Sequence, residues 1–202
     1  MKNIAISALC ISVTAIFYPQ TAAAQPAPSS QPAQTAPAGS PAVAAPSALT
    51  GARLLGQGNL RFLGFDIYRA RLWVQAGFDA LQYSAHPLAL ELEYQRDFKA
   101  EAIAKRSIEE MRRVGSFTDQ QAARWQLALQ QALPDIRAGD RLLGVYRPGA
   151  GAVFEMGGRV VGEVPDAEFS RLFFGIWLSP KTSEPSLRQA LLASPRATAA
   201  PQ

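Results

Sequence analysis

Apolar and polar residues alternate along the first patterned part of the chain, which predicts strands. The clearest case is the run PLALELEYQR, residues 87–96, in which leucines alternate with Glu91 and Glu93. A period of two places such side chains on opposite faces of a strand. A sheet with one apolar and one polar face is typical of antiparallel strands. We therefore predict antiparallel strands within residues 52–74 and 87–96.

The pattern then changes to a helical period and predicts a helix from about 97 to 114. Asp97 is its expected cap and Gly115 its end. The expected inner face consists of Ala100, Ile103, Ser107, Met111 and Val114. Charged residues of this helix, including Arg106 and the pair Glu109 and Glu110, are expected to face solvent.

A second helix is predicted directly after the first. Thr118 and Gln121 have the spacing of a capping box, and apolar residues follow at helical intervals as far as Leu133. Pro134 then closes the helix. Three short strands follow within 141–164, separated by Pro148-Gly149 and Gly157-Gly158 turns.

The last part of the domain predicts two more helices. Asp166 stands at a helix start, and the following stripe consists of Phe169, Leu172, Phe173, Ile176 and Trp177. Pro180 cannot continue that helix, so it ends near Leu178. Ser183 is the expected cap of a final helix that has Pro185 in its first turn. This order of elements predicts an α+β fold, an antiparallel sheet with helices packed on one face.

Both ends of the chain differ in composition from the domain between them. Residues 1–24 have the form of a signal peptide, with Lys2 before an apolar run that is too short for a membrane span, and a cleavage site at Ala22-Ala23-Ala24. Residues 25–48 are rich in Pro, Ala and Ser and predict a disordered linker; residues 194–202 predict a disordered tail. The expected domain is 49–193, exported to the periplasm, with no transmembrane span in the mature chain.

Composition excludes several functional classes. The net charge is +4, and basic residues are scattered among acidic ones, so nucleic-acid binding is not expected. The single cysteine, Cys10, leaves with the signal peptide, and His86 is the one histidine. We therefore expect no metal, no cofactor and no thiol or histidine catalysis. Ser179 lies in GIWLSP at a helix end rather than at a nucleophile elbow, and no catalytic residue is assigned.

The candidate binding residues lie in the first hairpin, where Arg61 and Tyr68 stand among Phe62, Phe65 and Trp73. An arginine that faces an apolar cleft can hold a carboxylate or an enolate-like oxygen, and a tyrosine hydroxyl adds a donor. The alternative is that these arginines, with Arg69 and Arg71, decorate the outer face of the sheet.

Three segments resemble the chalcone isomerase-like family, in its bacterial exported branch. They are LLGQGNLRFLGFDIYRARLWV (54–74), GDRLLGVYRPGAGAVFEMGGRVVGEV (139–164) and FSRLFFGIWLSPKTSEPSLRQALL (169–192). The resemblance implies an open-faced β-sandwich, a large sheet with helices over one face and a ligand cleft between them. Plant members of the family close a chalcone ring, and fatty-acid-binding relatives hold an acyl carboxylate.

The resemblance also implies positions for the catalytic residues of the true isomerases. Arg61 matches the family arginine, with Arg53 as a rival. The four remaining polar positions fall on Leu63, Ala122, Leu129 and Phe169, which are all apolar.

Three functional hypotheses follow. The first is a non-catalytic exported protein that binds a small amphipathic or acyl ligand, with Arg61 and Tyr68 as ligand-binding residues. The second is an intramolecular lyase or isomerase that acts on an enone. The third is an envelope protein-interaction module.

Overall fold

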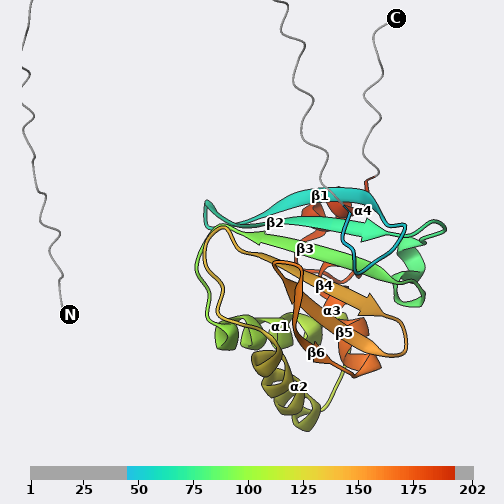
Figure 1. Ribbon diagram of the computed structural model, residues 1–202. Coiled ribbons are helices and arrows are strands. Elements are labelled where there is room, and N and C mark those ends of the chain that lie inside the picture. Colours follow the sequence, from blue (N-terminus) through green and yellow to red (C-terminus); the bar gives the residue numbers. More distant parts are fainter. Residues whose placement is uncertain (1–44, 194–202) are drawn as a thin grey trace, which may run out of the picture. The chain divides into compact units, whose positions relative to one another are not determined.

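The computed structural model describes residues 45–193, and its central feature is a six-stranded sheet (Figure 1). Each strand pairs antiparallel with its neighbours in the sequence, in the order β1-β2-β3-β4-β5-β6. The strands are β1 (Arg53–Phe62), β2 (Phe65–Val74), β3 (Leu88–Tyr94), β4 (Arg141–Arg147), β5 (Gly151–Met156) and β6 (Arg159–Val164). The predicted antiparallel sheet is confirmed.

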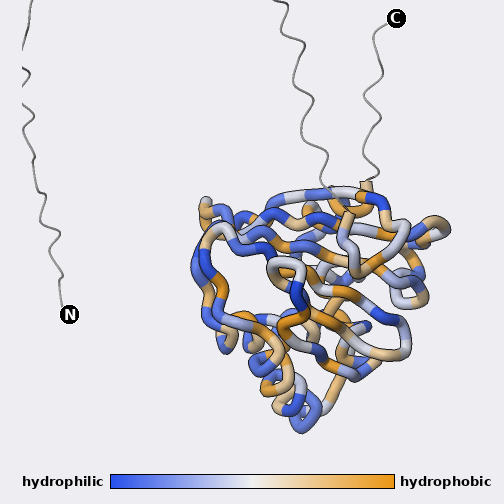
Figure 2. Tube along the Cα trace, in the orientation of Figure 1, coloured by the Kyte–Doolittle hydropathy of each residue, from blue (hydrophilic) through white to orange (hydrophobic). Residues whose placement is uncertain are grey.

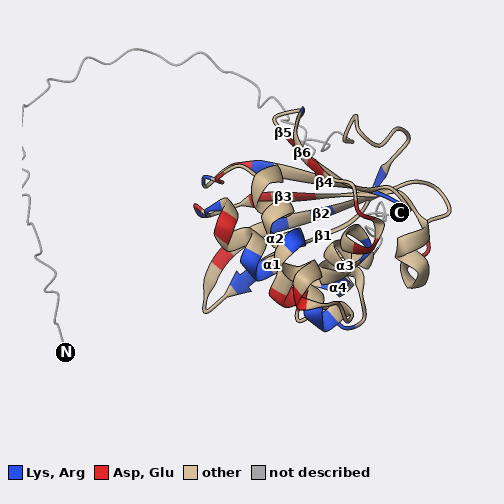
Figure 3. Cartoon of the chain, turned by 90° about the horizontal axis from the view of Figure 1, so that it is seen from below, with Lys and Arg blue, Asp and Glu red and all other residues tan. Residues whose placement is uncertain are grey.

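Helices cover one face of this sheet, as Figure 3 shows from below. They are η1 (Ala80–Ala85), α1 (Ala100–Val114), α2 (Asp119–Ala132), α3 (Ala167–Leu178) and α4 (Pro185–Leu192). Hydrophobic and hydrophilic positions alternate along the strands in Figure 2. The α+β prediction is therefore confirmed, with every predicted helix within one to three residues of its expected bounds.

The main core lies between the inner face of the sheet and the helices. Leu88, Leu90 and Leu92 of β3 are almost fully buried there, and the apolar stripe of α3 packs against them. Burying one such side chain stabilises the folded state by about 1.5–3 kcal/mol compared with leaving it exposed. The sheet-to-helix interface is the part of the fold in which a ligand cleft was expected.

The outer face of the sheet is only partly polar. Trp73, Ala89, Val145 and Val153 form a second buried cluster with Leu49, and residues 48–54 pack over it. The expectation of one wet face is thus wrong at this end of the sheet. The reason is that the segment before β1 folds back and shields the cluster from water.

Two helix caps are as predicted. Thr118 and Gln121 form the capping box of α2, and Asp166 accepts a hydrogen bond from Phe169 N at the start of α3. Two other caps were predicted wrongly. Asp97 does not cap α1; its carboxylate accepts from Ala138 N, and Asp135 accepts from Ala100 N instead.

Ser183 does not cap α4 either, because its hydroxyl donates to Glu110 of α1. Helix α4 lies directly against β1, where Gly56 permits the contact. A Cβ atom at Gly56 would lie 2.4 Å from the carbonyl oxygens of Ala190 and Leu191. This close packing explains how the last helix is attached to the first strand.

Several sequence predictions concern residues outside the described range. They are the signal peptide (1–24), all but the last four residues of the linker (25–48) and the tail (194–202). Within residues 45–193, no helix has the length and apolar character needed to cross a membrane.

Candidate functional site

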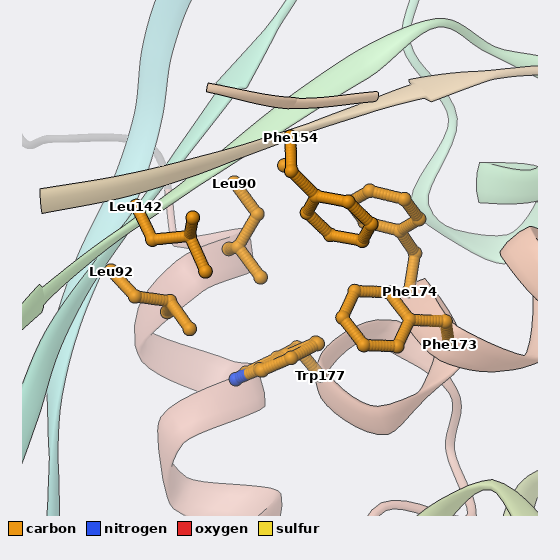
Figure 4. A pocket seen from close by; sticks show the side chains of 8 residues that line it. Leu90, Leu92, Leu142, Phe154, Phe173, Phe174 and Trp177 are labelled. Carbon is orange, nitrogen blue, oxygen red and sulfur yellow. The ribbon is translucent and has the colours of Figure 1, made fainter. Parts of the chain in front are cut away.

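An apolar cavity lies between the inner face of the sheet and α3 (Figure 4). Its volume is about 20 Å³. It is lined by Leu90, Leu92, Leu142, Gly144, Phe154, Phe173, Phe174 and Trp177. None of these side chains is ionisable, and the indole N–H of Trp177 is their one polar group. The cavity therefore suits the hydrocarbon part of a ligand.

At about 20 Å³, the cavity has room for about one water molecule. Aromatic rings fill the rest of the space: Phe173 packs edge to face against Phe154 and Trp177, at centroid distances of 5.6 and 5.5 Å. Gly144 keeps the floor open, because a Cβ atom there would lie 3.3 Å from the Phe174 ring. Between the sheet and α3, where the ligand cleft was expected, the described residues leave this small cavity.

Trp177 connects this cavity to Tyr68 of β2. The indole Nε1 donates to the Tyr68 hydroxyl at 3.0 Å. Within the described part of the chain, no hydrogen bond donated by the Tyr68 O–H is found. The pKa of Tyr68 lies above its ordinary value, chiefly because burial disfavours the phenolate, although the Trp177 hydrogen bond acts against this. Tyr68 is therefore a neutral phenol near pH 7, able to donate one hydrogen bond.

A buried carboxylate lies close to this pair. Glu110 of α1 is only 6% exposed; it accepts from Ser183 Oγ at 2.7 Å and forms ion pairs with Arg106 and Arg113. The charges of Glu110 and Arg106 both act on the pKa of Tyr68, in opposite directions. The prediction that Glu110 faces solvent is wrong, because a helical period from Ser107 and Val114 places it on the inner side of α1.

Arg61 does not join Tyr68 at this site. Its side chain is 65% exposed at the end of β1, where Nε pairs with Asp66 at 3.1 Å and Nη2 donates to the Gly64 carbonyl. The expectation that Arg61 faces an apolar cleft is thus wrong, since the hairpin itself holds the guanidinium in solvent. Arg53, the rival, is exposed at the other end of β1. A ligand-binding role for Tyr68 stays a prediction, and the one expected of Arg61 does not fit this exposed position.

The other polar residues of the hairpin follow the alternative interpretation. Arg71 lies on the outer face and is buried, and its guanidinium pairs with Glu91 at 2.5 Å and with Glu93 at 3.0 Å. Arg69 donates to Asn59 on the same face. Both arginines are occupied in cross-strand contacts, so they stabilise the sheet rather than line the cavity.

No described residues gather as a group of three or more His, Cys, Asp or Glu side chains that could hold a metal ion. His86 is partly buried and packs edge to face against Phe78. Ser179 ends α3 and accepts from Lys181 N, as a helix-end residue does.

Sequence reasoning missed two parts of the candidate site, the partnership of Trp177 with Tyr68 and the burial of Glu110. Trp177 was recognised as part of the α3 stripe, but its partner Tyr68 lies 109 residues away in the sequence, which no local pattern reveals. Glu110 could have been found from its helical spacing relative to Ser107 and Val114.

A meandering antiparallel sheet, with helices on one face and an apolar site between the layers, defines the class of fold. The chain matches the model of the chalcone isomerase-like family over residues 50–193, and it belongs to this family. This confirms the resemblance stated from the sequence.

The chain is also similar to two other proteins. One is an uncharacterized protein of Haemophilus influenzae, 26% identical over 138 residues, which are 68% of this chain; the match spans 66% of that relative's length. The other is a fatty-acid binding protein of Arabidopsis thaliana known from a crystal structure. It has a TM-score of 0.56 and 15% identity, with coverage of 73% of this chain and 90% of that one. The second likeness is one of fold.

Proposed function

We propose that this protein is an exported, non-catalytic binding protein that holds a small amphipathic or acyl ligand between the sheet and α3. The observation that carries the proposal is the hydrogen bond between Trp177 and Tyr68 at the apolar cavity. One neutral donor beside a hydrocarbon wall suits a ligand with an apolar body and a single polar head. The fold shared with a fatty-acid binding protein supports an acyl body.

Binding requires the cavity to enlarge. At about 20 Å³ it cannot hold a chain of several methylene groups, so the ligand must select a more open state of α3 and its aromatic side chains. The apparent affinity is then lowered by the rarity of that open state. This argues for a ligand with a large apolar surface, whose burial offsets the cost of opening.

Binding is better supported than turnover. An intramolecular lyase would need several donors around the charge that develops on an enone oxygen. The lining of the cavity offers no ionisable side chain, and Tyr68 and Trp177 provide the polar atoms beside it. The four positions that match the other catalytic residues of the family carry the apolar side chains Leu63, Ala122, Leu129 and Phe169.

Export is part of the proposal and rests on residues 1–24. Lys2, the apolar run and Ala22-Ala23-Ala24 support a cleavable signal, so the mature chain should begin at Gln25. The mass of the protein from a periplasmic fraction tests this. Recovery of the uncleaved chain from the cytoplasm alone would contradict it.

The closed cavity favours a second candidate, an envelope interaction module that holds no small ligand. Tightly packed aromatic rings are what a purely structural core would show. The experiment below separates the two.

The test is native mass spectrometry of the protein purified from its own periplasm, followed by titration with a fluorescent fatty acid. We expect a retained lipid or aromatic compound, and saturable probe binding. Leu142→Trp, which fills the cavity, should abolish binding. Leu143→Trp is the matched control, because Leu143 is the next residue of β4 and contacts the outer-face cluster.

Two results would end the binding proposal and favour the interaction module. One is the absence of any retained compound together with no probe binding. The other is equal binding by the Leu142→Trp and Leu143→Trp variants. Arg61→Ala should bind the probe as the wild type does, since its guanidinium is held by Asp66 in solvent.

A further inference from the structure

The turn between β1 and β2 exposes three large apolar side chains within four residues. Phe62, Leu63 and Phe65 are 60%, 81% and 54% exposed. Single exposed apolar residues are normal on a protein surface, but a run of them at the tip of a hairpin is not. We call Phe62, Leu63, Gly64 and Phe65 the hairpin tip.

The backbone of the hairpin tip is strained in order to present Leu63. Leu63 has φ of 48° and Gly64 has φ of 83°, the two positive values that a type I′ turn needs. Asn-Gly is the favoured pair in such a turn, and a leucine with positive φ is unfavourable. At 81% exposure, Leu63 gains little from packing. An unfavourable backbone conformation that does not stabilise the fold indicates that Leu63 serves a function other than folding.

Basic side chains flank the hairpin tip. The guanidinium of Arg96 lies 4.2 Å from the centre of the Phe65 ring. Arg61 lies on the other strand, paired with Asp66. These two arginines and the Asp66 carboxylate leave a balance of one positive charge beside the apolar side chains. Apolar side chains with guanidinium groups next to them are typical of a segment that enters the headgroup region of a membrane.

We propose that the hairpin tip docks onto an anionic lipid bilayer. A protein partner is less suited, because a stable interface needs about 800 Å² from each side, far more than the four residues of the hairpin tip offer. A bilayer needs no shaped counterpart. The docking would bring the Tyr68 end of β2 to the lipid surface, since Leu60 and Tyr68 are paired in the hairpin register. The inference rests on the hairpin and not on ligand binding.

The test is flotation of the purified mature protein, residues 25–202, with two kinds of vesicle, so that the apolar run of residues 1–24 takes no part. One kind is pure phosphatidylcholine, and the other is an equal mixture with phosphatidylglycerol. We expect the wild type to float with the mixed vesicles. Phe62→Ser/Phe65→Ser should lower its partition coefficient about tenfold or more. Val160→Ser/Val161→Ser is the matched control; it removes exposed apolar side chains from β6, at the opposite edge of the sheet, and should float as the wild type does.

Leu63→Asn keeps the test independent of folding. Asparagine is favoured in this turn, so the variant should melt at a higher temperature and yet float less than the wild type. The proposal is overturned if the wild type stays in the aqueous phase with the mixed vesicles, or if the valine variant loses as much as the phenylalanine variant. A concentration-dependent dimer that Phe62→Ser/Phe65→Ser abolishes would also overturn it, in favour of a second copy as the partner.

Discussion

The hydroxyl of Tyr68 shows how one residue acquires chemistry from three elements of the fold. β2 carries the ring, α3 supplies the Trp177 N–H, and α1 supplies the charges of Glu110 and Arg106. Tyr94 packs edge to face against the Tyr68 ring at 5.7 Å and holds it in place. The hydroxyl is thereby kept neutral, oriented and close to the cavity wall.

Tyr68→Phe should weaken binding of a fatty-acid probe about fivefold to tenfold, because one hydrogen bond to a polar head is worth roughly 1–1.5 kcal/mol. Titration of the fluorescent probe measures this. Tyr146→Phe is the control, since its hydroxyl donates to the Ser84 carbonyl and takes no part in the site. Equal weakening in the two variants would show that Tyr68 acts on stability alone.

Arg61 and Glu110 show why predictions about single residues fail. The sequence placed Tyr68 in the first hairpin, where it contacts Trp177, but it could not show that Arg61 would be held by Asp66 five residues away. That contact depends on the tight turn between the two strands. Glu110 was assigned to solvent by residue type, although helical spacing indicates a buried position. Burial of a charged residue depends on partners from distant segments, here Ser183.

Glu110→Ala should lower the free energy of unfolding by about 2–4 kcal/mol, because it removes a buried carboxylate and leaves the Ser183 hydroxyl without its acceptor. The two ion-pair partners, Arg106 and Arg113, are exposed, so water solvates their guanidinium groups in the variant. This limits the loss of stability. Glu109→Ala, at the exposed neighbouring position, is the control and should cost under about 0.5 kcal/mol. Urea unfolding of the wild type and the two variants measures these losses. Equal losses of stability in the two variants would show that the buried contacts of Glu110 do not stabilise the fold.

At the level of elements, the sequence predicted the helix cap that depends on neighbouring residues, but not the contacts made with distant elements. Thr118 caps its own helix through a residue three positions away, so the sequence alone predicted it. The cap of α1 comes from Asp135, 35 residues along the chain. Ser183 has a cap-like position but donates to α1 instead. In each failure, a partner from another element replaced the local one.

Asp166 has a double role that no local pattern shows. Oδ1 accepts from Phe169 N and caps α3, and Oδ2 accepts from the Trp125 indole of α2 at 2.7 Å. Asp166→Ala should therefore cost about 2–3 kcal/mol, the sum of a cap and a buried charge-assisted hydrogen bond. Thr118→Ala, which removes a cap alone, should cost about 1 kcal/mol. Urea unfolding compares them; a loss no larger than that of Thr118→Ala would contradict the link to α2.

At the scale of the whole molecule, the order of elements and the sheet-to-helix layering followed from periodicity, since both depend on patterns repeated over many residues. The closure of the cavity did not follow. Its volume is the small remainder after rings such as Phe173 and Trp177 fill the space between layers. So small a cavity volume depends on how individual side chains pack, and the periodicity of the sequence does not contain that information. The shielding of Trp73 by residues 48–54 is a similar case.

The tyrosines of the core make a prediction about the whole molecule at high pH. Burial raises the pKa of four tyrosines, Tyr68, Tyr83, Tyr94 and Tyr146, above the usual value of about 10. The folded state thus holds protons that the unfolded chain releases. The stability from these neutral phenols is present below about pH 10 and is lost as the pH rises through the folded-state pKa values.

We expect tyrosinate absorbance at 295 nm to appear together with unfolding, in one cooperative step. Tyr94→Phe should make the alkaline loss of stability less steep and leave its slope below pH 9 unchanged. Gradual ionisation of the tyrosines in a chain that stays folded, seen by circular dichroism, would contradict the burial of these hydroxyls.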